Sequence, residues 1–399
     1  MPDEAEQTDP VDSVKTYTKW QKIIWLCAMI GLLLTFILFT VLIGHFSKDL
    51  AAWSQRKVSI KTILLWNEPC KTCGQIGYDN GTEFADLLYE TCGKKCIFVS
   101  DWAIQNSSDA VIVFPRTIEN VNNVYPNKSF STQKLILFEK EPPSKDVIQK
   151  ASNTVPDGTF NWIASYVSDA DIILPYGKLV KRLPPYKHDA DFKDDLLDII
   201  NRKTEGIFAY TANCNSSTVK DRIVEEFKKY INVDLYSKCG NMSCDSKCFK
   251  QNLKKYRFYI AFESNVCDDY VTEKFFRIDN KIVPVVLRRK DYDEVGANHS
   301  FIALDDFEDM PSLASYLDSL MLDDTKYMEY FEWSKTYKKI TQPLHYSLCT
   351  VCDYIHEPTR SRSVLGEQSF SDWYSAKRRC DLEFIDKYFD SSQGRNTDL

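Results

Sequence analysis

The chain has 399 residues, of which 44% are hydrophobic and 27% are charged, and these ordinary globular values exclude a wholly disordered or collagen-like protein. Its 50 Lys and Arg residues against 57 Asp and Glu residues give a net charge of −7, without a basic block. A nucleic-acid-binding protein normally presents a basic face, so we expect no nucleic-acid partner. The length has room for two globular domains.

The first apolar segment, residues 23–44, predicts a membrane-spanning helix. It contains 22 residues without a charge, which is long enough to cross a bilayer at about 1.5 Å per residue. Three lysines precede the segment, whereas Lys48 behind it is opposed by Asp49. This charge bias predicts a cytoplasmic tail at 1–22, a type II anchor, a stem at 45–58 and a lumenal remainder.

The cysteines and glycosylation sequons agree with a secretory compartment. Cys27 lies in the span, and the other twelve cysteines form an even set that predicts disulfides. Zinc is the alternative, because the chain has two C-x2-C pairs, but these pairs are too far apart for a zinc ribbon. Six N-x-[S/T] sequons all follow the span: Asn80, Asn106, Asn127, Asn215, Asn241 and Asn298.

After the span, short continuous apolar runs predict strands that are covered on both faces, as in a parallel α/β sheet. The first set comprises residues 60–66, 97–100, 111–114 and 135–138. A second set begins near residue 202, with strands at 207–210, 233–236, 258–262 and 282–287 and helices at 219–230, 272–279, 310–320 and 324–336. A final amphipathic segment covers 370–389. We therefore expect two Rossmann-like halves that join near residue 200.

The strongest candidate for chemistry is the block at residues 258–277, an apolar strand, a polar loop and a helix. The first turn of that helix offers Thr272, Glu273 and Lys274. A helix N-terminus presents free N–H groups and a partial positive charge, so it can bind a phosphate. Lys274 would add a full positive charge to this site. The alternative is an ordinary capped helix with Lys274 in solvent.

This block resembles the donor-binding signature of the α-1,3-fucosyltransferases, glycosyltransferase family 10. The likeness continues in the same order through Ile63–Trp66, Phe138 with Glu141–Pro143, Asp169–Gly177, Val233–Tyr236 and the late C-x2-C pair. The resemblance implies a GT-B fold with an acceptor-binding domain at 59–200, a GDP-fucose-binding domain at 201–348 and a tail at 349–399 that returns to the first domain. It implies inverting transfer of L-fucose to O3 of a GlcNAc in a glycoprotein glycan, in the Golgi membrane. It also implies that no cofactor is required, with a divalent cation possible as a stimulant.

The resemblance also implies roles for individual residues. Glu141 matches the general base, which must reach the proton of the acceptor hydroxyl. Tyr270, Glu273 and Lys274 match donor contacts, with Lys274 placed to neutralise the leaving GDP. The full set of candidate donor contacts is Asn213, Lys220, Arg222, Ser264, Tyr270, Val271, Thr272, Glu273 and Lys274.

Several positions depart from the family pattern. Lys220 stands where the family has a phosphate-binding Arg, and Lys lacks the bidentate fork of Arg. Arg222 is two residues further on and faces elsewhere on a helix. The other departures are Val167, Ala212, Ser264 and Arg288. They favour a second hypothesis, a catalytically silent or weak homologue that binds a glycan or nucleotide at the membrane.

Metal dependence and disulfide pairing complete the expectations. Asp169–Asp171 and Asp189–Asp191 have the D-x-D form that holds Mn²⁺ in GT-A transferases. A metal-dependent GT-A enzyme is therefore a third hypothesis. Because the first pair lies inside the family motif, we predict no metal site. The family implies that cysteines near the start of the catalytic domain are bridged to the late C-x2-C pair, Cys349 and Cys352. Cys92 and Cys96 are the best matches by position, Cys70 and Cys73 are close enough to compete, and the sequence does not choose the pairing. The tail with Trp373 and Cys380 is similar to that of core-type invertebrate and plant members and favours core fucosylation of N-glycans.

Overall fold

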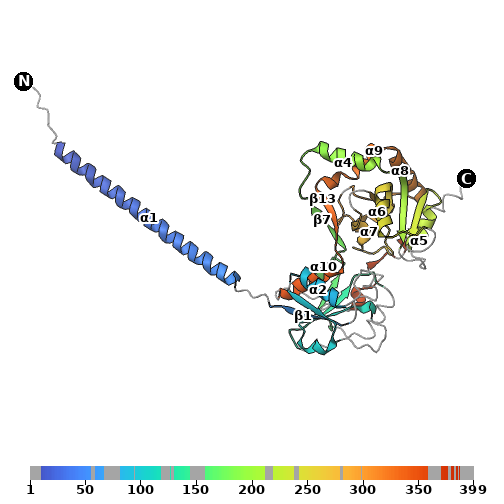
Figure 1. Cartoon of the computed structure of the whole chain (residues 1–399), viewed down its shortest axis with the longest axis horizontal. Coiled ribbons are helices and arrows are strands. Elements are labelled where there is room, and N and C mark those ends of the chain that lie inside the picture. The colour runs from blue at the N-terminus through green and yellow to red at the C-terminus, as the bar shows by residue number, and fades with distance from the viewer. Residues whose placement is uncertain are drawn as a thin grey trace, which may run out of the picture. The chain divides into compact units, whose positions relative to one another are not determined.

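The computed structural model describes residues 10–54, 59–66, 81–93, 95–117, 126, 130–143, 158–211, 219–237, 242–278, 282–297, 299–357, 370–375, 379–381, 383–384 and 386. The chain divides into two units, residues 1–59 and 60–399 (Figure 1).

The N-terminal unit contains one long helix, α1 (Pro10–Ser54). Within α1, Gln21–Gly44 has a mean hydropathy of 2.8 and is long and apolar enough to cross a membrane. Its large apolar side chains, such as Trp25 and Phe36, are exposed. A helix that is apolar on every side and unburied by protein fits a membrane anchor, as the uncharged run at residues 23–44 predicts.

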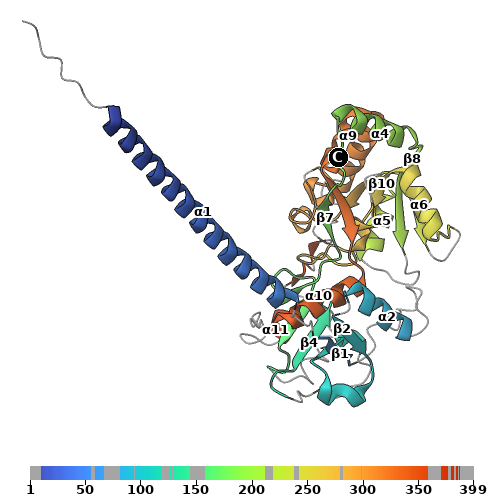
Figure 2. The ribbon, with the colours of Figure 1, turned by 60° about the vertical axis from the view of Figure 1, so that its left-hand side comes forward.

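In the second unit, the first sheet is parallel and has the order β2-β1-β3-β4-β5-β6 among the described residues. Its strands are β1 (Lys61–Leu65), β2 (Cys96–Val99), β3 (Ala110–Val113), β4 (Lys134–Glu139), β5 (Trp162–Ser165) and β6 (Ile172–Ile173). Helix α2 (Gly81–Thr91) lies beside β2, and α10 (Leu344–His356) lies beside α2 and β1 (Figure 2). Leu348 and Val351 of α10 are fully buried in the core on this face.

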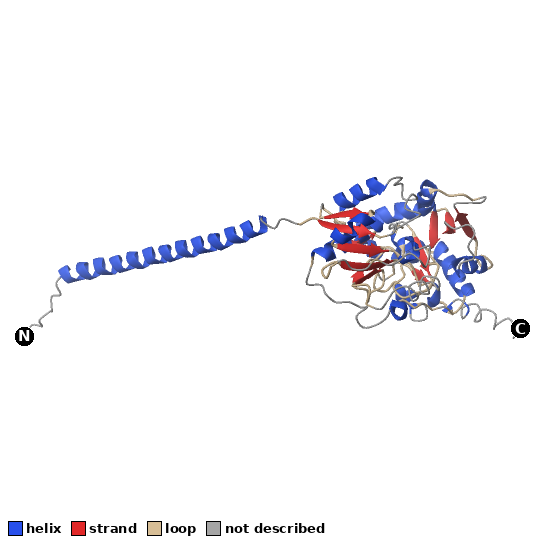
Figure 3. Ribbon diagram, turned by 90° about the horizontal axis from the view of Figure 1, so that it is seen from below, coloured by secondary structure: helices blue, strands red, loops and turns tan. Residues whose placement is uncertain are grey.

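The second sheet is also parallel, with the order β12-β11-β10-β8-β9 among the described residues. Figure 3 shows the strands of the two sheets in red as separate groups with helices around them. The strands are β8 (Glu205–Thr211), β9 (Val233–Ser237), β10 (Tyr256–Ile260), β11 (Val283–Val286) and β12 (Ile302–Ala303). The helices are α4 (Asp189–Asn201), α5 (Val219–Phe227), α6 (Ser246–Lys255), α7 (Glu273–Phe276), α8 (Met310–Leu322) and α9 (Asp324–Glu329).

Two segments, helix α4 and strand β7 (Gly177–Lys181), lie near the predicted domain boundary at residue 200. Helix α4 contributes Phe192, Leu196 and Ile200 to the core of the second sheet, although α4 precedes the predicted boundary at residue 200. Strand β7 pairs antiparallel with β13 (Tyr337–Thr341). A Cβ on Gly177 would lie 2.1 Å from Cγ of Phe276, so only glycine permits β7 to pass so close to α7. The predicted domain boundaries themselves stay predictions.

Three helices end earlier than their sequence patterns predict. Helix α5 ends at Phe227 of the predicted 219–230, and α7 covers only Glu273–Phe276 of the predicted 272–279. Within the predicted amphipathic segment at 370–389, α11 covers Phe370–Trp373. The predicted helix at 324–336 divides into α9 and a 3-10 turn, η6 (Glu332–Lys335). There the N–H of Ser334 donates to the carbonyl of Phe331 at 2.8 Å, the i to i+3 bond of a 3-10 turn, and the Trp333 indole donates to the carbonyl of Tyr330.

Disulfides join distant parts of the second unit. Cys92 is bonded to Cys349 and Cys96 to Cys352, so α10 is tied to the region around β2. Links between these two groups of cysteines are what the family resemblance implies, and the disulfide interpretation is confirmed for them; the structure adds which cysteine pairs with which. Two further bonds join Cys244 to Cys248 and Cys267 to Cys380. Cys70 and Cys73 lie outside the described residues.

Candidate active site

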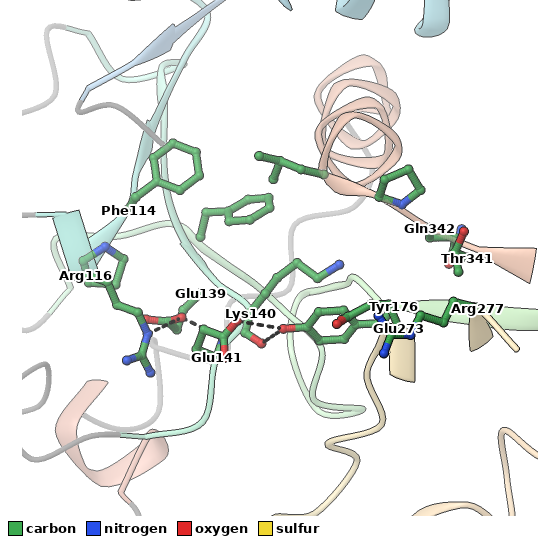
Figure 4. Close-up of a pocket in the computed structure, with 14 residues that line it drawn as sticks. Phe114, Arg116, Glu139, Lys140, Glu141, Tyr176, Glu273, Arg277, Thr341 and Gln342 are labelled. Carbon is green, nitrogen blue, oxygen red and sulfur yellow. Dashed lines mark hydrogen bonds and ion pairs between the residues drawn. The ribbon is translucent and has the colours of Figure 1, made fainter. Parts of the chain in front are cut away.

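A cavity of about 480 Å³ lies where the carboxyl ends of β3 and β4 approach α7 and the segment after β13 (Figure 4). The carboxyl edge of a parallel sheet is where α/β proteins bind their ligands, because strand ends and helix N-termini meet there. The polar side chains that line the cavity are Arg116, Glu139, Lys140, Glu141, Tyr176, Glu273, Arg277, Thr341 and Gln342. This cavity is the candidate active site.

Glu141, the predicted base, follows β4 and is exposed to the cavity. Its Oε2 accepts a hydrogen bond of 2.8 Å from the hydroxyl of Tyr270. Its Oε1 lies 3.3 Å from the hydroxyl of Tyr176, which also donates to the carbonyl of Lys140. Burial, reinforced by Tyr176 and Glu141, raises the pKa of Tyr270, so the phenol keeps the proton that it donates. Two tyrosines thus orient the carboxylate.

Glu139 fixes the backbone beneath the predicted base, and the sequence analysis did not identify it. Its buried Oε1 accepts from the N–H of Glu141 at 2.8 Å and from Nε of Arg116 at 3.0 Å. Arg116 also donates to the carbonyl of Pro142. Burial raises the pKa of Glu139 to about 7. Figure 4 shows Glu139 between Arg116 and Glu141, so the segment that carries the base is held from both sides.

Lys140 places a cation in the same cavity. Its ammonium donates to Oγ of Ser347 at 3.0 Å and lies 4.3 Å from the ring centre of Tyr176. Burial lowers the pKa of Lys140 to about 8, although Glu141 and Glu273 oppose this change. At neutral pH Lys140 is therefore mostly charged and balances part of the carboxylate charge around the cavity. It loses its proton as the pH rises through about 8.

On the side of the second sheet, Thr272 caps α7 by accepting from the N–H of Lys274. Both the N–H and the hydroxyl of Thr272 donate to Oε1 of the buried Glu263, at 2.9 and 2.8 Å. The ammonium of Lys274 lies 2.5 Å from Oε2 of Glu263. Burial disfavours the charge on Lys274, but the Glu263 carboxylate outweighs it and raises the pKa of Lys274. Lys274 is therefore not a solvent lysine, as the capped-helix alternative supposed.

Glu273 and Arg277 of the same turn also line the cavity. Glu273 is exposed. The guanidinium of Arg277 donates to the hydroxyl of Tyr259 at 2.7 Å and lies 4.1 Å from the ring centre of Phe249. Aromatic packing and one hydrogen bond hold this cation, and among the described residues no ion pair to a carboxylate is found for it. Arg277 adds positive charge to the α7 side of the cavity.

The remaining predicted residues are placed as follows. Val271 is buried beside Tyr270, and Ser264 is half-buried next to Asn265, whose amide donates to its hydroxyl at 3.2 Å. Arg222 is exposed on α5 and lies 3.5 Å from Asp386. Asn213 lies outside the described residues, as does the side chain of Lys220. Of the sequons, Asn106 is described and exposed, whereas Asn80, Asn127, Asn215, Asn241 and Asn298 lie outside the described residues.

Three of the four acidic residues considered as metal ligands have protein partners, and the fourth, Asp191, is exposed. Asp169 forms an ion pair of 2.9 Å with Arg379, and Asp171 accepts from the N–H of Ile163 at 2.8 Å. Asp189 begins α4 and lies 3.6 Å from the ammonium of Lys335. Within the described part of the chain, the grouping of potential ligand atoms is Cys96, Cys352 and His356. Its two sulfurs are already bonded to each other, so they are not the thiolates that a metal would need.

Two departures from the family pattern have structural roles. Val167 is buried in the core of the first sheet. Arg288, which stands at a usual glycine, donates to Asp291 at 2.7 and 2.8 Å and lies 3.0 Å from Asp268. Neither residue lines the cavity.

Sequence signals for the overlooked residues were weak. Glu139 ends an otherwise apolar strand, and a carboxylate at the end of a buried strand is a hint of a site. Glu263 and Tyr176 lie inside the quoted motifs without an assigned role. Nothing local in the sequence singles out Arg116, because its partner is 23 residues away. The geometry combines an oriented carboxylate with cations across one cavity, an arrangement suited to removing a proton from one ligand and binding the anionic part of another.

Comparison with known proteins agrees with this chemistry. A family model described as "Fucosyltransferase, N-terminal" matches residues 59–177, and one described as "Glycosyltransferase family 10 (fucosyltransferase) C-term" matches residues 200–373. A solved structure described as alpha1,3-fucosyltransferase has a TM-score of 0.50 with 14% identity, and the match covers 77% of this chain and 93% of that chain. At this identity the likeness concerns the fold alone.

The curated relatives are also named as fucosyltransferases. Alpha-(1,3)-fucosyltransferase fut-1 of Caenorhabditis elegans is 32% identical over 251 residues, 61% of this chain and 55% of the relative. Glycoprotein 3-alpha-L-fucosyltransferase A of Drosophila melanogaster is 32% identical over 57% of this chain and 45% of the relative. The match thus spans about half the length of these two relatives. The human 4-galactosyl-N-acetylglucosaminide 3-alpha-L-fucosyltransferase FUT6 is 30% identical over 76% of this chain and 80% of the relative.

The two family models follow each other along the chain and meet at the cavity: the first match includes Glu141, and the second includes Glu273. The relatives with 30% identity or more extend the agreement over most of the second unit. On this evidence the chain belongs to the fucosyltransferases of glycosyltransferase family 10.

Proposed function

We propose that the protein is an inverting α-1,3-fucosyltransferase that transfers L-fucose from GDP-fucose to O3 of a GlcNAc residue in a glycoprotein glycan. The observation that supports this most directly is the carboxylate of Glu141, oriented by Tyr270 and Tyr176 at the edge of the cavity. Transfer to a sugar hydroxyl needs a base at such a position. Family membership gives the donor and the acceptor class as proposals for this chain.

In the proposed reaction, Glu141 accepts the proton of the acceptor O3 hydroxyl as that oxygen attacks C1 of fucose. The new C1–O3 bond forms on the face opposite the departing GDP, so the configuration at C1 inverts. The bond between C1 and the phosphate oxygen breaks, and GDP leaves with the electron pair. Because Tyr270 already donates to Oε2 at 2.8 Å, Oε1 with its longer contact of 3.3 Å is the oxygen with capacity for the proton.

The α7 side of the cavity suits the leaving diphosphate. Lys274 does not itself line the cavity, but it lies in the same turn as Glu273, and Glu263 holds its ammonium in one fixed position. Arg277 adds a second cation, and Glu273 projects a carboxylate into the same space, where it can accept hydrogen bonds from sugar hydroxyls and face the positive charge that develops on fucose. The other predicted donor contacts, Asn213 and Lys220 among them, remain part of the proposal.

We propose a GT-B arrangement in which the sheet of β1–β6 serves the acceptor and the sheet of β8–β12 serves GDP-fucose. The apolar helix α1 supports a type II anchor with the catalytic unit in the Golgi lumen. The disulfides support the same side of the membrane, since disulfides persist in the oxidising secretory pathway. A cofactor is not part of the proposed reaction.

The test is turnover by the full chain in detergent. Labelled GDP-fucose is offered with an N-glycopeptide that has GlcNAc in both the core and the antennae, with and without EDTA. We expect a fucosylated glycopeptide whose linkage analysis shows fucose on O3 of GlcNAc, and the modified residue distinguishes core from antenna. Absence of transfer with retained GDP binding would favour the silent homologue. Loss of activity in EDTA would favour a metal-dependent reaction.

A further inference from the structure

The loop between β10 and α7, which carries Tyr270, is joined to the C-terminal segment of the chain. Cys267 is bonded to Cys380. On either side of this bond, the N–H of Asp268 donates to the carbonyl of Arg379, and the N–H of Asp381 donates to the carbonyl of Val266, both at 2.8 Å. Residues 266–268 and 379–381 are therefore held together by a covalent bond and by paired backbone hydrogen bonds.

The same C-terminal segment packs on the first sheet. We refer to residues 370–375 and 379–381 as the strap. Trp373 and Tyr374 of the strap are fully buried in the core that contains Val111, Leu137 and Tyr166. Arg379 stacks over the Trp373 ring and forms an ion pair of 2.9 Å with Asp169. The strap thus connects the loop of the second sheet to the side of the molecule that carries Glu141.

Asp269, next to Tyr270, makes a direct bond across the same junction. Its Oδ2 accepts both the N–H and the hydroxyl of Ser168, at 2.9 and 2.8 Å. Asp269 has a φ of 62°, a left-handed conformation that Asp adopts more readily than most residues. Neighbouring Asp268 is held by Arg288 and Lys290 at 3.0 and 2.9 Å. The loop is therefore fixed from three directions immediately before Tyr270.

We propose that Asp269 and the strap, which is joined to the loop by the Cys267–Cys380 bond, are positioning elements that hold the Tyr270 hydroxyl on the carboxylate of Glu141. This inference rests on the proposed function, because it assigns Glu141 as the base. Tyr270 is tied to the loop through its N–H, which donates to the carbonyl of Cys267 at 3.2 Å. A shift of the loop therefore moves the phenol away from Glu141, although neither Asp269 nor the disulfide lines the cavity.

The strap extends beyond the part of the chain that the family models match. The second family match ends at residue 373, so Arg379 and Cys380 lie beyond it. Arg288, a departure from the family pattern, lies in the same network through Asp268. A bulky cation at a usual glycine thus acquires a role in holding the loop.

The kinetic test uses the full chain in detergent and two disulfide variants. Cys267→Ser with Cys380→Ser removes the strap bond, and Cys244→Ser with Cys248→Ser is the matched control in the same half. We expect the strap variant to lose roughly tenfold or more in kcat, with the KM for GDP-fucose changed by less than about threefold, because misplacement of catalytic groups costs rate. The control should change neither. Equal losses in both variants, or a loss confined to KM, would overturn the proposal.

A double-mutant cycle keeps every cysteine and tests the route through Tyr270. Asp269→Asn suits the left-handed backbone but weakens the bond to Ser168, and Tyr270→Phe removes the hydroxyl on Glu141. If Asp269 acts through Tyr270, Asp269→Asn lowers kcat severalfold in the natural chain but has no further effect in the Tyr270→Phe background. Additive effects in the cycle would contradict the positioning role.

Hydrogen exchange separates this proposal from the proposed function. The N–H of Ser168 is bonded to Asp269, so loss of the strap bond should speed exchange in peptides that cover 166–171 and 266–272 together, and the Cys244/Cys248 control should not. Unchanged exchange at 166–171 would overturn the coupling whatever the activity. If the natural chain transfers no fucose from GDP-fucose, the proposed function fails, while the exchange experiment still decides whether the strap holds the loop.

Discussion

The carboxylate of Glu139 accepts the backbone N–H of Glu141 at 2.8 Å, so one buried acid supports the backbone of another acid that faces the cavity. The two residues have opposite environments although a single residue separates them. Glu139 lies in the protein beside Arg116, whereas Glu141 lies in the open between two tyrosines. This division separates the structural carboxylate from the one proposed to accept a proton.

Glu141→Gln should reduce fucose transfer by about 10²-fold or more, because the amide keeps the shape of the side chain but cannot accept the proton. GDP binding, measured by calorimetry, should persist, since Glu141 lies on the acceptor side of the proposed reaction. Glu329→Gln, which changes an exposed acid on α9, is the control. Near-normal transfer by Glu141→Gln would remove this residue as the base.

Glu139→Gln should change the pH dependence of stability. Because burial raises the pKa of Glu139 to about 7 from an ordinary 4.5, the folded state binds more protons than the unfolded state between these values. As the pH rises from 4.5 to 7, the free energy of unfolding should therefore fall, by up to about 3 kcal/mol. Glutamine does not titrate, so denaturant unfolding of the variant should lose this part of the slope. An unchanged slope would contradict the raised pKa.

Lys274→Met should destabilise the protein by about 3–5 kcal/mol, because it leaves the buried carboxylate of Glu263 without its cation. The double variant with Glu263→Gln should recover much of this loss in denaturant unfolding, since no unpaired charge remains. GDP-fucose binding should stay weak in both, as each lacks the ammonium. Recovery of donor affinity in the double variant would show that Lys274 serves the fold alone.

Lys220→Arg should lower the KM for GDP-fucose severalfold, because a guanidinium binds a phosphate through two parallel hydrogen bonds and an ammonium does not. Arg222→Ala is the comparison, and its exposed position beside Asp386 predicts little change. Steady-state kinetics at saturating acceptor measure both. A severe loss in Arg222→Ala with no gain in Lys220→Arg would make Arg222 the phosphate contact.

Removal of both the Cys92–Cys349 and the Cys96–Cys352 bond by serines should lower the free energy of unfolding by about 2–5 kcal/mol, because the two bonds, with sequence separations of 257 and 256, close nearly the same long loop. Activity should fall with it if α10 must stay on the first sheet. Paired serines at Cys244 and Cys248, four residues apart, should cost much less. Non-reducing peptide mapping of the natural chain should recover Cys92 with Cys349 and Cys96 with Cys352.

Much of the local architecture follows from the sequence. The continuous apolar runs at β1, β3 and β4 predict buried parallel strands because a strand covered on both faces has no polar side. The uncharged run in α1 predicts a membrane span because a long apolar helix is more stable in the hydrocarbon core of a bilayer than in water. The order of motifs identifies the family and singles out Glu141. Each of these properties depends on residues that are neighbours in the chain.

The contacts that shape the candidate site depend on the tertiary structure. Tyr270 reaches Glu141 across 129 positions of sequence, and Arg379 reaches Asp169 across 210. Neither periodicity nor motif spacing encodes such a meeting, because it depends on how two separately patterned sheets pack and on where the C-terminal segment returns. Local side-chain patterns determine which residues are buried in each sheet. Only the packing of the sheets decides which polar groups face each other across the cavity.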